Sequence, residues 1–203
     1  MTNTVVIAFG CPRAGTTFLQ KAVEGLSGAF AFKMAEWTPL HPCKSDRGLL
    51  DISRLFSTRE LILVRIYRDP LEIAESFLAA RTKKAGDKFL GIARHTDREV
   101  SKYICDESEN VFRQKALLRE RKNTRLIEVR YESLATSEGR KKFTAALAPF
   151  SRGEGFRKTL DTFGKRPVRA GRMTLGLGRV STKNERLYFE SRLKEVRKRE
   201  GYV

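Results

Sequence analysis

Short apolar runs rich in β-branched residues alternate along the chain with segments whose apolar residues recur at helical spacing. The runs at 5–9, 29–33, 60–67 and 125–131 predict strands. The run at 60–67 is apolar almost without interruption, as is typical of a parallel strand covered on both faces. Because strands alternate with helices, we expect an α/β fold: a three-layer parallel sheet of about four to five strands with helices on both faces.

After most of these runs, apolar residues recur at the spacing of a helix. The expected helices begin after Gly15 and at Pro70, span 97–121, 138–149 and 154–163, and run from Ser181-Thr182 to Gly201. The helix at Pro70 has a clear start, because Asp69 is an N-cap residue and Glu72 stands three positions after it. The positions that this spacing places inside the helices are Leu19, Val23, Ile73, Phe77, Val100, Ile104, Val111, Leu117, Leu118, Leu187, Phe189, Leu193 and Val196.

Composition limits the class of protein. Of the 203 residues, 40% are hydrophobic, which suits one globular domain spanning 1–203. No run approaches the roughly 18 apolar residues of a membrane span, and the N-terminus lacks a signal-peptide profile, so we expect a soluble, cytoplasmic protein. The three cysteines are widely spaced and form no CxxC motif, so neither a disulfide framework nor a zinc site is expected.

The chain is strongly basic. It has 41 Lys and Arg against 24 Asp and Glu, a formal net charge of +17. Such an excess favours an anionic partner, which could be nucleic acid, an acidic polysaccharide or peptide, a membrane surface or a multiply charged cofactor. A solvated basic surface without a specific partner fits the same excess equally well.

The segment from Gly10 to Thr17 connects the first expected strand to the first helix. Its glycines let the backbone approach a ligand closely, and the helix start supplies N–H groups and the positive end of a dipole. This arrangement predicts a phosphate-binding loop. Its spacing fits the nucleotide-binding motif G-x-x-x-x-G-K-[ST], except that Thr16 replaces the lysine and Arg13 is the only basic residue.

The segment Pro12-Arg13-Ala14-Gly15-Thr16-Thr17-Phe18-Leu19 resembles the P-R/K-S-G-T-T-W/F-L loop of the sulfotransferases. In that family the loop binds the 5′-phosphosulfate end of PAPS (3′-phosphoadenosine 5′-phosphosulfate). The resemblance implies that PAPS is the cofactor and PAP (adenosine 3′,5′-bisphosphate) the product. The cofactor-binding residues implied in this loop are Pro12, Arg13, Ala14, Gly15, Thr16 and Thr17.

A second segment strengthens this resemblance. Arg68-Asp69-Pro70-Leu71-Glu72-Ile73-Ala74-Glu75-Ser76 is similar to the family element R-D/N-P-x-[DE]-x-x-x-S, which implies that Arg68 and Ser76 hold the 3′-phosphate. The alternative for Ser76 is a hydrogen bond back to the carbonyl of Glu72. Tyr131 begins a segment similar to the family's R-Y-E-D-L, which implies a place near the adenine, although packing against the sheet explains a tyrosine there equally well.

A glycine- and arginine-rich stretch begins at Arg166 and precedes the last expected helix. In sulfotransferases a late loop of this kind closes over the 3′-phosphate. The resemblance therefore implies cofactor-binding roles for Arg172 and Arg179, although the loop does not align residue by residue. Residues 82–96 are basic, contain glycine and show no period, so we expect a loop or lid there.

Sulfuryl transfer needs a group that neutralises charge on the leaving phosphate and a base that accepts the acceptor's proton. Arg13 suits the first task, because a guanidinium stays charged and can donate to two oxygens together. Glu36 and His41 follow the second strand and are the candidate bases. Either has a plainer explanation: Glu36 as an ion-pair partner of a nearby cation, and His41 as an ordinary loop residue.

The resemblance implies a sulfotransferase whose acceptor is a hydroxyl or an amine. The basic excess favours an acidic carbohydrate or an acidic peptide as that acceptor, and hydrophobic small molecules stay open as an alternative. No metal is expected, because the loop and the arginines would neutralise the donor. Two alternatives stay open. One is a nucleotide kinase with a degenerate phosphate loop, and the other is a basic nucleic-acid-binding module, which the lack of interleaved aromatic and basic residues makes the weaker of the two.

Overall fold

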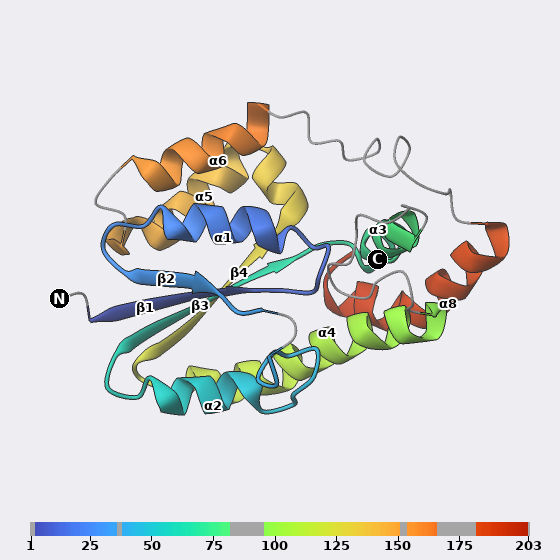
Figure 1. Ribbon diagram of the computed structural model, residues 1–203, viewed down its shortest axis with the longest axis horizontal. Helices are drawn as coiled ribbons and strands as arrows, with labels where there is room; N and C mark the ends of the chain where they lie inside the picture. Colours follow the sequence, from blue (N-terminus) through green and yellow to red (C-terminus); the bar gives the residue numbers. More distant parts are fainter. Residues whose placement is uncertain (1–2, 36–37, 82–95, 151–153, 166–181, 203) are drawn as a thin grey trace.

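The computed structural model describes residues 3–35, 38–81, 96–150, 154–165 and 182–202 (Figure 1). In this part of the chain, four parallel strands form one sheet in the order β2-β1-β3-β4. The strands are β1 (Thr4–Phe9), β2 (Phe30–Lys33), β3 (Glu60–Tyr67) and β4 (Thr124–Arg130). The predicted α/β class and the parallel sheet are confirmed.

Helices cover both faces of this sheet. On one face lie α1 (Thr16–Glu24), α5 (Ser137–Leu147) and α6 (Gly155–Lys165), and on the other lie α2 (Gly48–Leu55) and α4 (Asp97–Arg119) (Figure 1). Beyond the carboxyl ends of the strands, α3 (Pro70–Arg81) and α8 (Lys183–Arg199) pack against each other and against α4. Two short 3₁₀ helices, Tyr131–Ala135 and Ala148–Phe150, flank α5. The three-layer arrangement is as predicted.

Alternation along each strand divides the core between the two faces. In β1, Val6 and Ala8 pack toward α1, whereas Val5, Ile7 and Phe9 pack toward α2 and α4. The central strand β3 repeats this division along its length. Both of its faces are therefore largely apolar, with Arg65 as the buried charged exception, which explains the nearly continuous apolar run that the sequence shows at 60–67.

Two helix positions differ from the prediction. Leu117 and Leu187, both expected inside, are exposed by 48% and 54%. In α4 the buried face passes through Leu118, and one residue rotates a helix by about 100°, so Leu117 lies off that face. In α8, Leu187 precedes the buried Phe189 by two residues, which places it on the opposite side.

The helix α2 has no counterpart among the predicted elements, because its eight residues are too few for a clear period.

The ends of α8 agree with the prediction. Thr182 caps its first turn in a reciprocal capping box with Glu185, and Gly201 follows its last turn with a φ of 76°. Within the described ranges, none of the helices combines the length and the apolar character needed to cross a bilayer.

A buried arginine ties three elements together. Arg65 in β3 is only 3% exposed and forms paired hydrogen bonds with Glu107 of α4, with N–O distances of 3.0 and 2.7 Å. It also donates to Glu200 at 2.8 Å and to Glu128 of β4 at 3.2 Å. Burial would lower the pKa of Arg65, but the carboxylates of Glu107 and Glu200 raise it well above its usual value, so the guanidinium stays charged.

Candidate active site at the carboxyl ends of β1 and β3

The loop between β1 and α1 follows a path that only glycine allows at two points. A Cβ on Gly10 would lie 2.2 Å from the carbonyl oxygen of Ile66 in β3. A Cβ on Gly15 would lie 2.6 Å from the ring of Tyr131, and the φ of Gly15 is 102°, a left-handed value that other residues rarely adopt. The loop is therefore packed directly against the ends of β3 and β4.

Arg13 has the backbone conformation that usually belongs to glycine. Its φ is 73°, and among the described residues it is the one non-glycine residue with a positive φ. The turn that holds it is closed by a hydrogen bond of 3.0 Å from Ala14 N to Cys11 O. A left-handed non-glycine residue costs about 1–2 kcal/mol, and such strain gathers at functional sites. From this turn the side chain of Arg13 extends to Ser76 of α3, whereas its neighbours Pro12 and Ala14 are buried.

The two phosphate-binding segments expected from the sequence contact each other. Arg13 Nε donates to Ser76 Oγ at 3.0 Å, although the two residues lie 63 positions apart. Ser76 Oγ is the acceptor in this bond, so its hydroxyl proton can still be donated to the carbonyl of Glu72, the alternative considered for this residue. The loop after β1 and the helix after β3 meet at the carboxyl edge of the sheet, where ligands bind in open α/β folds.

Arg68 lies at the same edge, between an aromatic ring and a carboxylate. Its guanidinium carbon is 4.9 Å from the ring centre of Tyr131, and its Nε donates to Glu72 Oε2 at 2.6 Å. Glu72 thus binds Arg68 instead of completing a capping box. The cap of α3 is Asp69, whose Oδ1 accepts a hydrogen bond from Leu71 N at 2.9 Å. Burial raises the pKa of Tyr131 although the charge of Arg68 opposes this shift, so the phenol remains a neutral donor.

The start of α1 is suited to an anion. Its N-cap residue is Gly15, which supplies no side-chain acceptor, and its first turn contains no acidic residue. Thr16 is buried at the start of the helix, whereas Thr17 is exposed. The N–H groups and hydroxyls of this turn belong to residues only three and four positions after Arg13 in the chain. An oxyanion bound at the turn would therefore lie beside Arg13.

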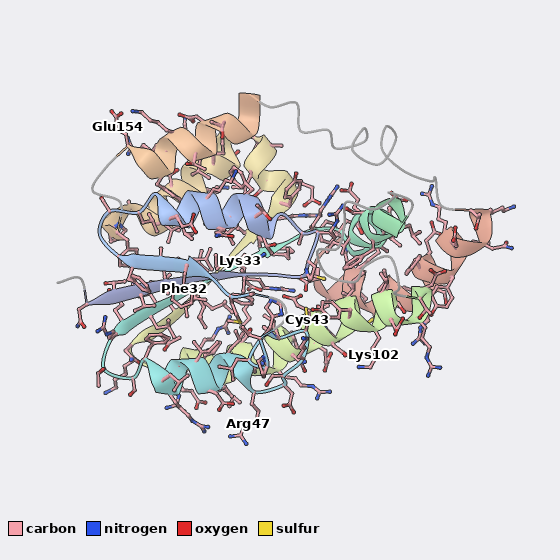
Figure 2. The ribbon with its side chains drawn as sticks, viewed as in Figure 1. Phe32, Lys33, Cys43, Arg47, Lys102 and Glu154 are labelled. Carbon is pink, nitrogen blue, oxygen red and sulfur yellow. The ribbon has the colours of Figure 1, made fainter. Side chains whose placement is uncertain are left out.

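Of the two candidate bases, the structure describes only His41. Its side chain is fully buried, and its Nδ1 accepts a hydrogen bond of 3.2 Å from Cys43 N, which assigns the proton of the neutral ring to Nε2. Cys43 lies on the inner side of this loop (Figure 2) and its thiol contacts Cys11 of the phosphate loop. His41 therefore lies close to the predicted site but beneath its surface, where an acceptor does not reach it. Glu36 lies outside the described residues.

The remaining predicted residues fall on parts of the chain that are not described. These are the two arginines of the late basic loop, Arg172 and Arg179, and residues 82–95 of the loop or lid expected at 82–96. In the first turns of α4, the exposed Lys102 points outward (Figure 2). The described site consequently consists of the phosphate loop, Arg68, Ser76 and Tyr131.

A set of contacts behind Arg68 is not predictable from the local sequence. Arg197 of α8 forms a two-pronged ion pair with Asp69, and the hydroxyl of Tyr202 donates to Glu132. The partners lie 128 and 70 positions apart, so no local pattern could have revealed them. The only signal was the Gly-Tyr ending that follows the last predicted helix.

In comparisons with known proteins, no family model, no curated protein and no solved structure matches the chain.

Proposed function

We propose that this chain is a sulfotransferase that moves a sulfuryl group from PAPS to a hydroxyl or amine acceptor. The observation that carries the proposal is the hydrogen bond from Arg13 to Ser76, which joins the two segments expected to bind opposite ends of PAPS. The pairing of Arg68 with Tyr131 at the same edge supports it, because an arginine on an aromatic ring suits the phosphate and adenine of one nucleotide.

In this proposal the start of α1 and the hydroxyls of Thr16 and Thr17 bind the 5′-phosphosulfate. Arg13 donates to the bridging oxygen and to a sulfonate oxygen, and so stabilises the negative charge that grows on the leaving phosphate. Arg68 and Ser76 bind the 3′-phosphate. The base that accepts the acceptor's proton is Glu36, since His41 is buried beneath the surface of the site.

The acceptor in this proposal is anionic, a carbohydrate or an acidic peptide, because the chain's formal net charge of +17 exceeds what one cofactor needs. A transfer screen with radiolabelled sulfate across glycans, peptides, lipids and phenols identifies it. Incorporation only into uncharged lipids or phenols would contradict this part of the proposal.

Titration calorimetry tests the cofactor assignment. We expect PAP to bind without magnesium, and we expect Arg68→Ala to weaken PAP by about tenfold or more because it removes a charge-assisted contact. Ser76→Ala loses a neutral hydroxyl and has a smaller effect. Arg113→Ala is the matched control, since it removes the same charged side chain from the exposed side of α4.

The same titrations distinguish the alternatives. A kinase would bind ATP with magnesium in preference to PAP. A nucleic-acid-binding module would bind an oligonucleotide with a steep dependence on salt and would be indifferent to Arg68→Ala. Either result, in a chain that does not bind PAP, would overturn the sulfotransferase proposal.

A further inference from the structure

The last turn of the chain reverses direction beside the predicted site. After α8 ends, Gly201 takes its left-handed conformation, and Tyr202 N donates back to Arg197 O at 2.8 Å. This reversal sends Tyr202 toward the end of β4, while Arg197 faces the start of α3 from the preceding turn. We call residues 197–202 the C-terminal turn.

The first contact of the C-terminal turn is with the residue after Arg68. Arg197 Nε and Nη2 donate to Asp69 Oδ1 and Oδ2 at 3.0 and 3.1 Å, a parallel arrangement that fixes the carboxylate in orientation as well as position. Asp69 Oδ1 also caps α3 through Leu71 N. The pair is mostly buried, with side-chain exposures of 22% and 18%, so water screens it only weakly. Arg197 thus holds the junction between β3 and α3, from which Arg68 projects.

The second contact is with the residue after Tyr131. Tyr202 donates its hydroxyl proton to Glu132 Oε2 at 2.9 Å, and the guanidinium carbon of Arg130 lies 3.8 Å from the centre of the Tyr202 ring. Burial and the charge of Glu132 raise the pKa of Tyr202 far above its usual range, which keeps the phenol protonated as a donor. Glu132 Oε1 in turn accepts from Asp69 N at 3.3 Å, so the two contacts are linked.

The two contacts share one geometry. In the pairs Arg68-Asp69 and Tyr131-Glu132, the first residue faces its stacking partner at the edge of the sheet and the second is held from behind by the C-terminal turn. Building on the proposed function, we infer that Arg197 and Tyr202 are positioning residues: they set the distance and angle between Arg68 and Tyr131, and thereby the affinity of the pocket for the 3′-phosphate.

This arrangement gives a selective effect. Arg197 and Tyr202 reach the residues that follow β3 and β4, whereas Phe189, Leu193 and Val196 of α8 share an apolar cluster with Cys11 and Ala14 of the phosphate loop. Loss of the polar contacts therefore loosens the 3′-phosphate pocket and spares the site for the 5′-phosphate. Loss of apolar packing acts on the phosphate loop, so it is not expected to lower the affinity for the 3′-phosphate selectively.

The experiment compares PAP with adenosine 5′-monophosphate (AMP), which lacks the 3′-phosphate. For the full chain with Arg197→Gln or Tyr202→Phe, calorimetry is expected to show PAP binding weakened by about tenfold, as small displacements of binding groups produce, and AMP binding changed by less than about twofold. Arg197→Lys keeps the charge but not the paired geometry and is expected to recover only part of the PAP affinity.

Val196→Ala is the matched control. It removes buried apolar contact from the same helix and lowers the melting temperature without touching either polar contact. Equal losses of PAP and AMP affinity in Arg197→Gln and Tyr202→Phe, or a selective loss in Val196→Ala, would overturn the positioning role and leave the proposed function intact. If the unmodified chain does not bind PAP, the proposed function fails, and the positioning role fails with it.

Discussion

Replacing Arg13 with glycine is expected to lower kcat for sulfuryl transfer by about 10²–10³-fold, the usual cost of removing one donor that stabilises charge in a transition state. Glycine is the informative replacement because Arg13 has a φ of 73°, which glycine adopts without strain. The variant therefore loses the guanidinium while the loop keeps its path. The measurement is single-turnover transfer from PAPS to an acceptor found in the transfer screen.

The effect should appear mainly in kcat and less in KM for PAPS, because the charge on the bridging oxygen grows only as the bond to sulfur breaks. Ser76→Ala serves as the comparison, since it removes the present partner of Arg13 but not the positive charge. Arg13→Lys keeps the charge and loses the forked geometry, so we expect an intermediate rate. A kcat for Arg13→Gly within about twofold of the unmodified chain would remove Arg13 from the mechanism.

The second large effect concerns stability. Arg65→Met is expected to lower the free energy of unfolding by about 3–5 kcal/mol, because removing one partner leaves buried carboxylates without their cation. The most affected is Glu107, which is 3% exposed and accepts two hydrogen bonds from Arg65, at 3.0 and 2.7 Å. Urea denaturation at neutral pH measures this loss. Arg54→Met, which breaks an exposed pair with Asp51, is the control and should cost less than about 1 kcal/mol.

The loss should also depend on pH. Burial already raises the pKa of Glu107 while the charge of Arg65 opposes that shift, so removing Arg65 raises it further. Burial also acts to raise the pKa of Glu200, which Arg65 and Ser108 Oγ together hold below its usual value, and that restraint weakens in the variant. A raised carboxyl pKa in the folded state stabilises the fold at low pH and loses that stabilisation as the pH rises.

The deficit of Arg65→Met is therefore expected to be smaller near pH 5 than at pH 7, and Glu107→Gln in the same chain should recover part of it. Lys115 still pairs with Glu128 in this variant, so Glu128 contributes less to the change. A deficit below about 1 kcal/mol, or one that grows as the pH falls, would contradict this account of the cluster.

The local pattern predicted the fold well because strands and helices differ in the spacing of their apolar residues. Apolar runs of four to eight residues predicted all four described strands, with ends within a residue or two. Proline and an N-cap residue marked the start of α3, and Ser181-Thr182 marked the start of α8. The short α2 lacked such signals. The exposure of Leu117 depended on which side of α4 packs inward, and that of Leu187 on which side of α8 packs against α3 and α4.

The candidate site was predictable in part. The phosphate loop and the segment from Arg68 to Ser76 were recognisable because each is continuous in the sequence and follows a strand. The burial of His41 was not, because a histidine in a proline-rich loop looks exposed until the loop is folded onto its neighbours. The three carboxylates around Arg65 were equally hidden, since they come from β4, α4 and the residue after α8.

The sequence by itself determined the elements, their alternation and the loop that offers N–H groups to an anion, because these follow from neighbours along the chain. Only the tertiary structure decided that Arg13 meets Ser76, that Arg68 stacks on Tyr131 and that the C-terminal turn supports both strand ends. These contacts join residues 63 to 128 positions apart. Such pairs form only when packing of the sheet and its helices brings their backbones together, and no local spacing encodes that approach.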